Sequence, residues 1–123
     1  MARFKEAQLS IAVNQSNQTA NVLIKGQVLV DPNDVGSFII ECSVLGDDIA
    51  FDDKLFQYQP GGFVAGGFTS VVPFEFNSSE QLGILNEDII GKDEIYANLV
   101  LRKNNEIGPI VSKIKTNVVQ ISA

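Results

Sequence analysis

Apolar and polar positions alternate along this chain with a period of two, most clearly in its last third. Ile95, Ala97, Leu99 and Leu101 share one parity there. After a break at residues 104–109, a second run shares one parity at Ile110, Ser112, Ile114, Thr116 and Val118. Such alternation is typical of a strand with one buried and one solvated face. The pattern therefore predicts two strands joined by a turn.

Weaker alternation predicts five earlier strands, and no stretch has the 3.6-residue period of an amphipathic helix. The predicted strands cover residues 7–13, 19–30, 37–45, 49–59 and 68–77, with Asn, Asp, Gly or Pro between them. The first two form a predicted hairpin. Pro73 lacks an N–H, so we expect its strand at a sheet edge or a bulge. One short helical turn is predicted near residues 78–83, with Ser78 or Ser79 capping its start.

About seven short strands with turns between them predict an all-β fold. We expect a single antiparallel β-sandwich over residues 1–123, with an immunoglobulin-like or fibronectin-III-like architecture. A small barrel is the alternative. The immunoglobulin "tyrosine corner" would place a Cys two residues after Tyr96, but Asn98 stands there. The sequence therefore indicates an architecture without assigning a family.

Length and composition fit one ordinary domain. The chain has 123 residues, of which 45% are hydrophobic, and a domain of this size can form a core without metals or disulfides. The single Cys42 shares its parity with Phe38, Ile40 and Val44, which predicts a small buried side chain. We expect no membrane insertion, because the apolar runs are far shorter than a span. The absence of a visible signal peptide or an internal disulfide favours a cytoplasmic protein.

Acidic residues dominate the middle of the chain. The net charge is −6, which disfavours nucleic acid as a partner because a phosphate backbone would be repelled. Between Gly26 and Gly91, Lys54 is the one basic residue against eleven acidic ones, a net charge of −10, whereas the flanks carry about +4. Chance clustering explains this most simply. A divided surface that favours an oriented partner or head-to-tail self-association is the alternative.

The inventory of reactive side chains argues against an enzyme. The chain has no His, which excludes Ser-His-Asp and Cys-His catalysis and also Cys/His zinc sites. No phosphate-binding loop is present, and we expect no cofactor. Catalysis by carboxylates alone is the weakest alternative, since it would need two carboxylates across a substrate cleft.

Four acidic residues form the one candidate metal site in the sequence. Asp47, Asp48, Asp52 and Asp53 cluster around residues 49–51. Calcium prefers carboxylate oxygens, but the spacing is not that of an EF-hand. Solvated loop charges are the simplest interpretation, and loop-bound calcium is the alternative.

Aromatic residues gather around a glycine-rich segment at residues 59–68, which is predicted to be a permissive loop. Tyr58, Phe63 and Phe68 either cover the end of the core or form an apolar surface for a partner. A carbohydrate platform is less favoured because the chain has no Trp. The leading hypothesis is a non-catalytic binding or assembly module that contacts a protein partner, or itself, through surface loops or edge strands. A loop-based calcium or carbohydrate domain is the alternative.

Overall fold

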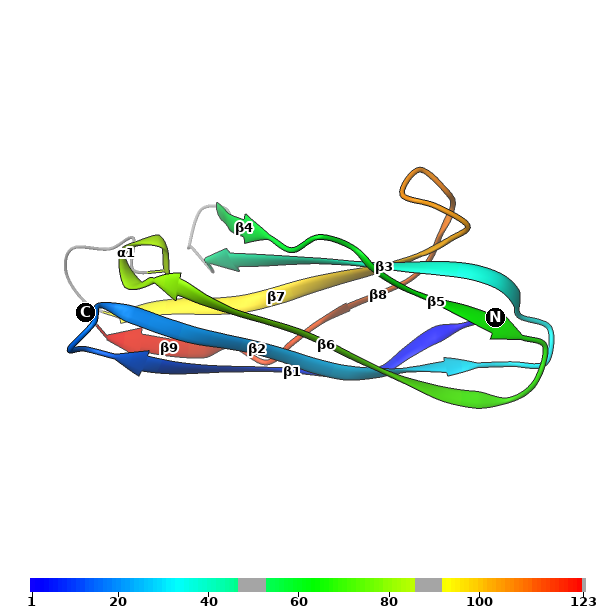
Figure 1. Ribbon diagram of the computed structural model, residues 1–123, viewed down its shortest axis with the longest axis horizontal. Helices are drawn as coiled ribbons and strands as arrows, with labels where there is room; N and C mark the ends of the chain where they lie inside the picture. Colours follow the sequence, from blue (N-terminus) through cyan, green and yellow to red (C-terminus); the bar gives the residue numbers. More distant parts are fainter. Residues whose placement is uncertain (47–52, 86–91, 123) are drawn as a thin grey trace.

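Two antiparallel sheets pack face to face in the computed structural model, which describes residues 1–46, 53–85 and 92–122 (Figure 1). Nine strands are present in these ranges: β1 (Arg3–Asn14), β2 (Thr19–Val30), β3 (Val35–Gly46), β4 (Asp53–Gln57), β5 (Gly61–Gly66), β6 (Ser70–Gln81), β7 (Lys92–Lys103), β8 (Ile110–Lys115) and β9 (Val119–Ser122). One helical turn, α1, covers Leu82–Leu85. No helix in these ranges is long and apolar enough to cross a membrane.

The nine strands occupy seven positions. One sheet has the order β1-β2-β6. In the other, β3 and β7 lie in the middle, β4 and β5 pair with successive parts of one edge of β3, and β8 and β9 pair with successive parts of one edge of β7. The predicted sandwich of about seven strands is therefore confirmed, as is the hairpin formed by β1 and β2. The small barrel is excluded because the described strands form two separate sheets.

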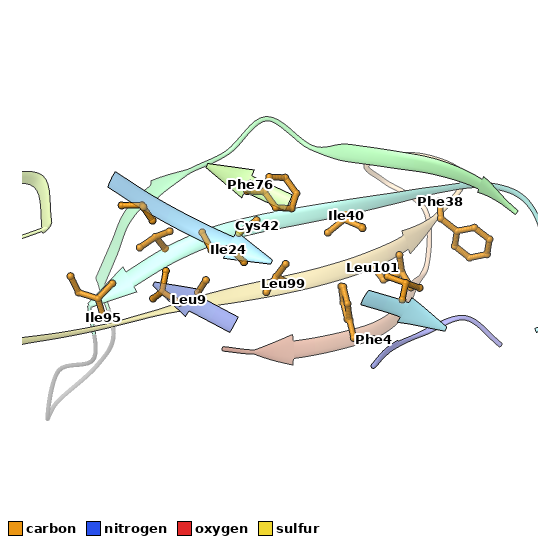
Figure 2. Close-up of a cluster of buried hydrophobic side chains, with 14 of the residues drawn as sticks. Phe4, Leu9, Ile24, Phe38, Ile40, Cys42, Phe76, Ile95, Leu99 and Leu101 are labelled. Carbon is orange, nitrogen blue, oxygen red and sulfur yellow. The ribbon is translucent and has the colours of Figure 1, made fainter. Parts of the chain in front are cut away.

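The core lies between the sheets, where the alternating positions meet. Ile95, Ala97, Leu99 and Leu101 of β7 are all fully buried, which confirms the parity read from the sequence. Cys42 is also buried, as expected. Figure 2 shows Ile95, Leu99, Leu101 and Cys42 gathered with side chains of the facing sheet, which include Leu9 and Ile24. Each large apolar side chain buried in this way contributes roughly 1.5–3 kcal/mol.

Two local predictions were wrong. The segment predicted as a loop at residues 59–68 contains β5, which pairs with β3 from Val35↔Gly66 to Ile40↔Gly61. Its alternation was hidden because glycine occupies three of the positions, while Phe63 and Ala65 face the core. The predicted single helical turn is present at Leu82–Leu85, but Ser78 and Ser79 do not cap it, because β6 continues its pairing with β2 as far as Gln81.

The final predicted strand is split in two by a change of parity. Thr116 N–H donates to the Ala97 carbonyl (2.9 Å), and Thr116 Oγ1 accepts a hydrogen bond from Ala97 N–H (2.8 Å). The Thr116 hydroxyl thus accepts the hydrogen bond that a backbone carbonyl would otherwise accept from β7. The register of pairing with β7 shifts by one residue between β8 and β9. Consequently Val118 is exposed, although the sequence placed it with Ile114, and Val119 packs against the core instead.

Side chains close one long side of the sandwich. Leu9 N–H on β1 donates to Asn117 Oδ1 (2.8 Å), and Asn117 Nδ2 donates to the Leu9 carbonyl (3.0 Å). Nearby, Phe4 N–H donates to Ser112 Oγ (3.1 Å). The carboxamide of Asn117 therefore makes the two hydrogen bonds to β1 that the backbone of a neighbouring strand would make, and these bonds link the two sheets.

Candidate interaction surface

The three aromatic residues singled out in the sequence lie in different surroundings. Tyr58 is half-buried, and its hydroxyl lies 2.8 Å from Ser78 Oγ on β6. Phe63 faces the core and stacks on Phe38, with ring centroids 5.3 Å apart. Phe68, between β5 and β6, is 63% exposed. The structure therefore does not bring them into one patch, and a binding role for each stays a prediction.

Phe68 does belong to an exposed apolar patch, together with two residues that the sequence analysis did not single out. Val35 pairs with Gly66 across β3 and β5, and Val64 precedes Gly66 by two residues on the same face of β5. A Cβ on Gly66 would lie 2.7 Å from a Phe68 ring carbon, so the ring rests on the glycine. Val35, Val64 and Phe68, which we name the apolar patch, are 62%, 76% and 63% exposed.

The backbone and the charges around the apolar patch suit an uncharged contact. Gly67 has a positive φ of 83°, which turns the chain so that Phe68 can fold back over the strand. The carboxylate of Asp34, next to Val35, is buried and accepts a hydrogen bond from Asp31 N–H (2.8 Å). The Asp34 side chain therefore adds no exposed charge next to Val35.

A row of aromatic rings supports the sheet that contains β6. Tyr58 lies 5.3 Å from Phe56 and 5.5 Å from Phe76 between ring centroids, and Phe74 continues the row to Phe4 at 5.7 Å. Burial raises the pKa of Tyr58 to about 12, the largest cause being loss of water around the hydroxyl. These rings act mainly in packing.

Two hollows interrupt the surface near this row. A space of about 200 Å³ opens between β5 and β6, and we name it the lateral slot. Its lining includes Ile40, Phe63, Val72, Phe74 and Phe76. A wider hollow of about 630 Å³ lies over the outer face of the sheet β1-β2-β6, with mostly polar residues around it: Glu6, Gln8, Lys25, Gly26, Gln27, Pro73, Phe74 and Glu75.

Metal and nucleophile chemistry gain no support from the described residues. Among them no group of three or more His, Cys, Asp or Glu side chains could hold a metal ion. Asp47, Asp48 and Asp52, and the side chain of Asp53, lie outside what the structure describes, so the calcium site stays a prediction. Burial raises the pKa of the Cys42 thiol to about 12, which makes it a poor nucleophile.

Comparison with known proteins identifies a shared fold. No known protein family and no curated protein matches the chain. Among solved structures, a putative β-galactosidase from Bacteroides fragilis matches with a TM-score of 0.69 and 8% identity, over 99% of this chain and 17% of that one. A β-glucuronidase from Bacteroides uniformis matches with a TM-score of 0.70 and 11% identity, over 93% of this chain and 14% of that one. This chain therefore has the fold of a β-sandwich domain, and it spans less than a fifth of those glycosidases.

Proposed function

We propose that this chain is a non-catalytic β-sandwich module whose copies associate through the apolar patch. The observation that carries the proposal is the contiguity of Val35, Val64 and Phe68, three exposed side chains that surround Gly66. Contiguous exposed apolar surface marks an interaction site far more often than scattered apolar residues do. An uncharged patch is also complementary to its own copy across a two-fold axis.

The size of the apolar patch indicates a weak, reversible dimer. Three side chains form the centre of a contact at the lower end of known interfaces, where association is transient. The central residue is Phe68, because its ring lies over the strand between the two valines. A two-fold contact buries this ring twice, and each burial contributes roughly 1.5–3 kcal/mol. Loss of both rings should therefore weaken the dimer by about 100-fold or more.

Analytical ultracentrifugation from micromolar to millimolar protein tests the proposal. We expect a reversible dimer for the natural sequence and a monomer for Phe68→Ser and Val64→Ser. Ile107→Ser is the matched control, since Ile107 is 92% exposed but lies in the β7–β8 turn. Its dimer should be unchanged. A natural sequence that stays monomeric throughout this range would overturn the proposal.

Sugar binding in the hollow over β1-β2-β6 is a second candidate function. Glu6, Gln8, Lys25 and Gln27 line it, and the structure shows no hydrogen bond from their side chains to the described residues. Amide and carboxylate groups arranged in this way can bond adjacent sugar hydroxyls. Calorimetry with galactose and glucuronic acid, sugars suggested by the names of the structural neighbours, tests this candidate. Binding that Gln8→Ala does not weaken would place the sugar elsewhere.

A further inference from the structure

The outer edge of β6 carries backbone groups without partners in the described chain. Leu82 N–H donates to the Gln18 carbonyl (2.8 Å), and the register between β2 and β6 runs without a shift. In an antiparallel pair successive residues direct their N–H and C=O to opposite edges. The backbone N–H and C=O groups of the even-numbered residues of β6 therefore bond to β2. Those of the odd-numbered residues point away from β2, at Val71, Pro73, Glu75, Asn77, Ser79 and Gln81.

Proline stands at one of these outward positions. Pro73 is odd-numbered, so its missing N–H removes no hydrogen bond to β2, which explains how the residue fits within a 12-residue strand. It also limits where another strand could pair. The uninterrupted run of outward donors and acceptors extends from Glu75 to Gln81.

The lateral slot lies directly beside this edge. The inward-facing residues Val72, Phe74 and Phe76 of β6 form one wall, and Phe63 of β5 lies on the other. At Ser78 the hydrogen bond to Tyr58 joins the two sheets. A strand added to β6 would direct alternate side chains into this slot.

The two edges of the three-stranded sheet differ. On β1, Ser112 and Asn117 satisfy outward backbone groups and join the edge to the other sheet. On β6, no side chain of the described residues bonds to the outward backbone groups. The same sheet is thus closed on one side and open on the other.

We propose that β6 accepts an extended segment of another protein as a fourth strand of the sheet β1-β2-β6. Backbone hydrogen bonds to residues 75–81 would provide affinity, and apolar side chains in the lateral slot would provide specificity, as in other cases of strand addition. This site is separate from the apolar patch and goes beyond the proposed function.

Charge indicates the chemistry of the segment. Glu75 and Glu80 are the charged residues of β6, and β5 has none. Glu75 lies on the outer face of β6 and the apolar lining of the lateral slot on the inner face, so the segment should alternate basic residues facing outwards with apolar residues facing the slot. Charge also argues against a second copy, because two paired β6 strands would contribute four carboxylates and no basic side chain to the contact.

The test uses a synthetic peptide of alternating Val and Lys, with the ends blocked, and ¹⁵N-labelled protein. We expect amide shifts along β6 and around the lateral slot, and slower hydrogen exchange at Glu75, Asn77 and Ser79. A peptide of the same composition without alternation should bind at least tenfold more weakly. Equal binding of the two peptides, or no binding at millimolar concentration, would overturn the proposal.

Three protein variants locate the site. Ser79→Pro removes an outward N–H without removing a hydrogen bond to β2, and we expect about tenfold weaker binding from that one lost bond and the misfit of the ring. Glu75→Lys, which leaves the backbone unchanged, should also weaken binding of the basic peptide. Phe68→Ser should bind the peptide normally, which separates this site from the apolar patch. Normal binding by both Ser79→Pro and Glu75→Lys would contradict strand addition at β6.

Discussion

Replacing Asn117 with alanine should destabilise this domain far more than its surface position suggests. The side chain is exposed, yet it donates to and accepts from the backbone of Leu9, a buried residue on the opposite sheet. Asn117→Ala leaves both groups of Leu9 without that partner. The effect should therefore resemble the loss of two strand-pairing bonds.

The size of the effect follows from those two bonds. An intramolecular hydrogen bond contributes about 0.5–1.5 kcal/mol net, so the pair contributes roughly 1–3 kcal/mol. For a domain of this length, 1 kcal/mol corresponds to a change in melting temperature of about 4 °C. We therefore expect Asn117→Ala to melt roughly 4–12 °C below the natural sequence.

Thermal unfolding followed by circular dichroism measures the change in melting temperature, urea unfolding measures the change in the free energy of unfolding, and hydrogen exchange at the Leu9 amide locates the effect. Asn21→Ala is the matched control, since Asn21 is exposed on β2 and its side chain makes no hydrogen bond to the described residues. Surface substitutions of that kind change stability by about 0.5 kcal/mol or less. If both variants unfold at the same urea concentration, with unchanged exchange at Leu9, then Asn117 does not hold the sheets together.

Two more predictions concern the core. Gly26→Ala should lower the free energy of unfolding by roughly 1–3 kcal/mol, because a Cβ at this position overlaps the Glu6 carbonyl and the Phe74 ring. Gly83→Ala is the control, since a Cβ there meets open space and should not destabilise the domain. Equal unfolding midpoints for the two variants would contradict the close packing around Gly26. The Cys42 thiol should resist labelling at pH 8 until urea is added, and rapid labelling of the folded protein would contradict its burial. The pKa of Cys42 in the folded protein is raised to about 12 from an ordinary value of 9.0. The contribution of this thiol to the free energy of unfolding should therefore fall as pH rises from about 9 to 12, and Cys42→Ala should lack that part of the pH dependence.

Much of the fold could be predicted because period-two alternation reports directly on burial. Residues 19–30 were predicted to the residue as β2, and Ile95 to Leu101 marked the buried face of β7. The errors occurred where backbone pairing does not depend on side-chain pattern. Glycine concealed β5, and the Thr116 hydroxyl took a backbone role that no periodicity records.

The candidate surface was harder to predict than the fold. Phe68 was selected by composition, and it is exposed, but Tyr58 and Phe63 face other neighbours. Val35 and Val64 escaped notice because they are 29 positions apart in the sequence and meet only through strand pairing around Gly66. One signal was available, since Val64 has the opposite parity to the inward pair Phe63 and Ala65. Pro73 did predict that its strand lies at a sheet edge or a bulge, and β6 is an edge strand, but no side-chain pattern indicates that the outward backbone groups from Glu75 to Gln81 lack partners.

The pair of hydrogen bonds between Leu9 and Asn117 also constrains the order in which the chain can fold. The two residues are 108 positions apart, so their contact closes almost the whole length of the polypeptide. The hairpin of β1 and β2 can form early, since its strands are adjacent, but one edge of β1 stays open until the last strands arrive. Contacts of such long range slow folding, because the chain loses the entropy of closing the loop before the contact contributes any stabilising free energy. During synthesis, the sheet β1-β2-β6 therefore has open edges at both β1 and β6 for as long as residue 117 remains in the ribosome.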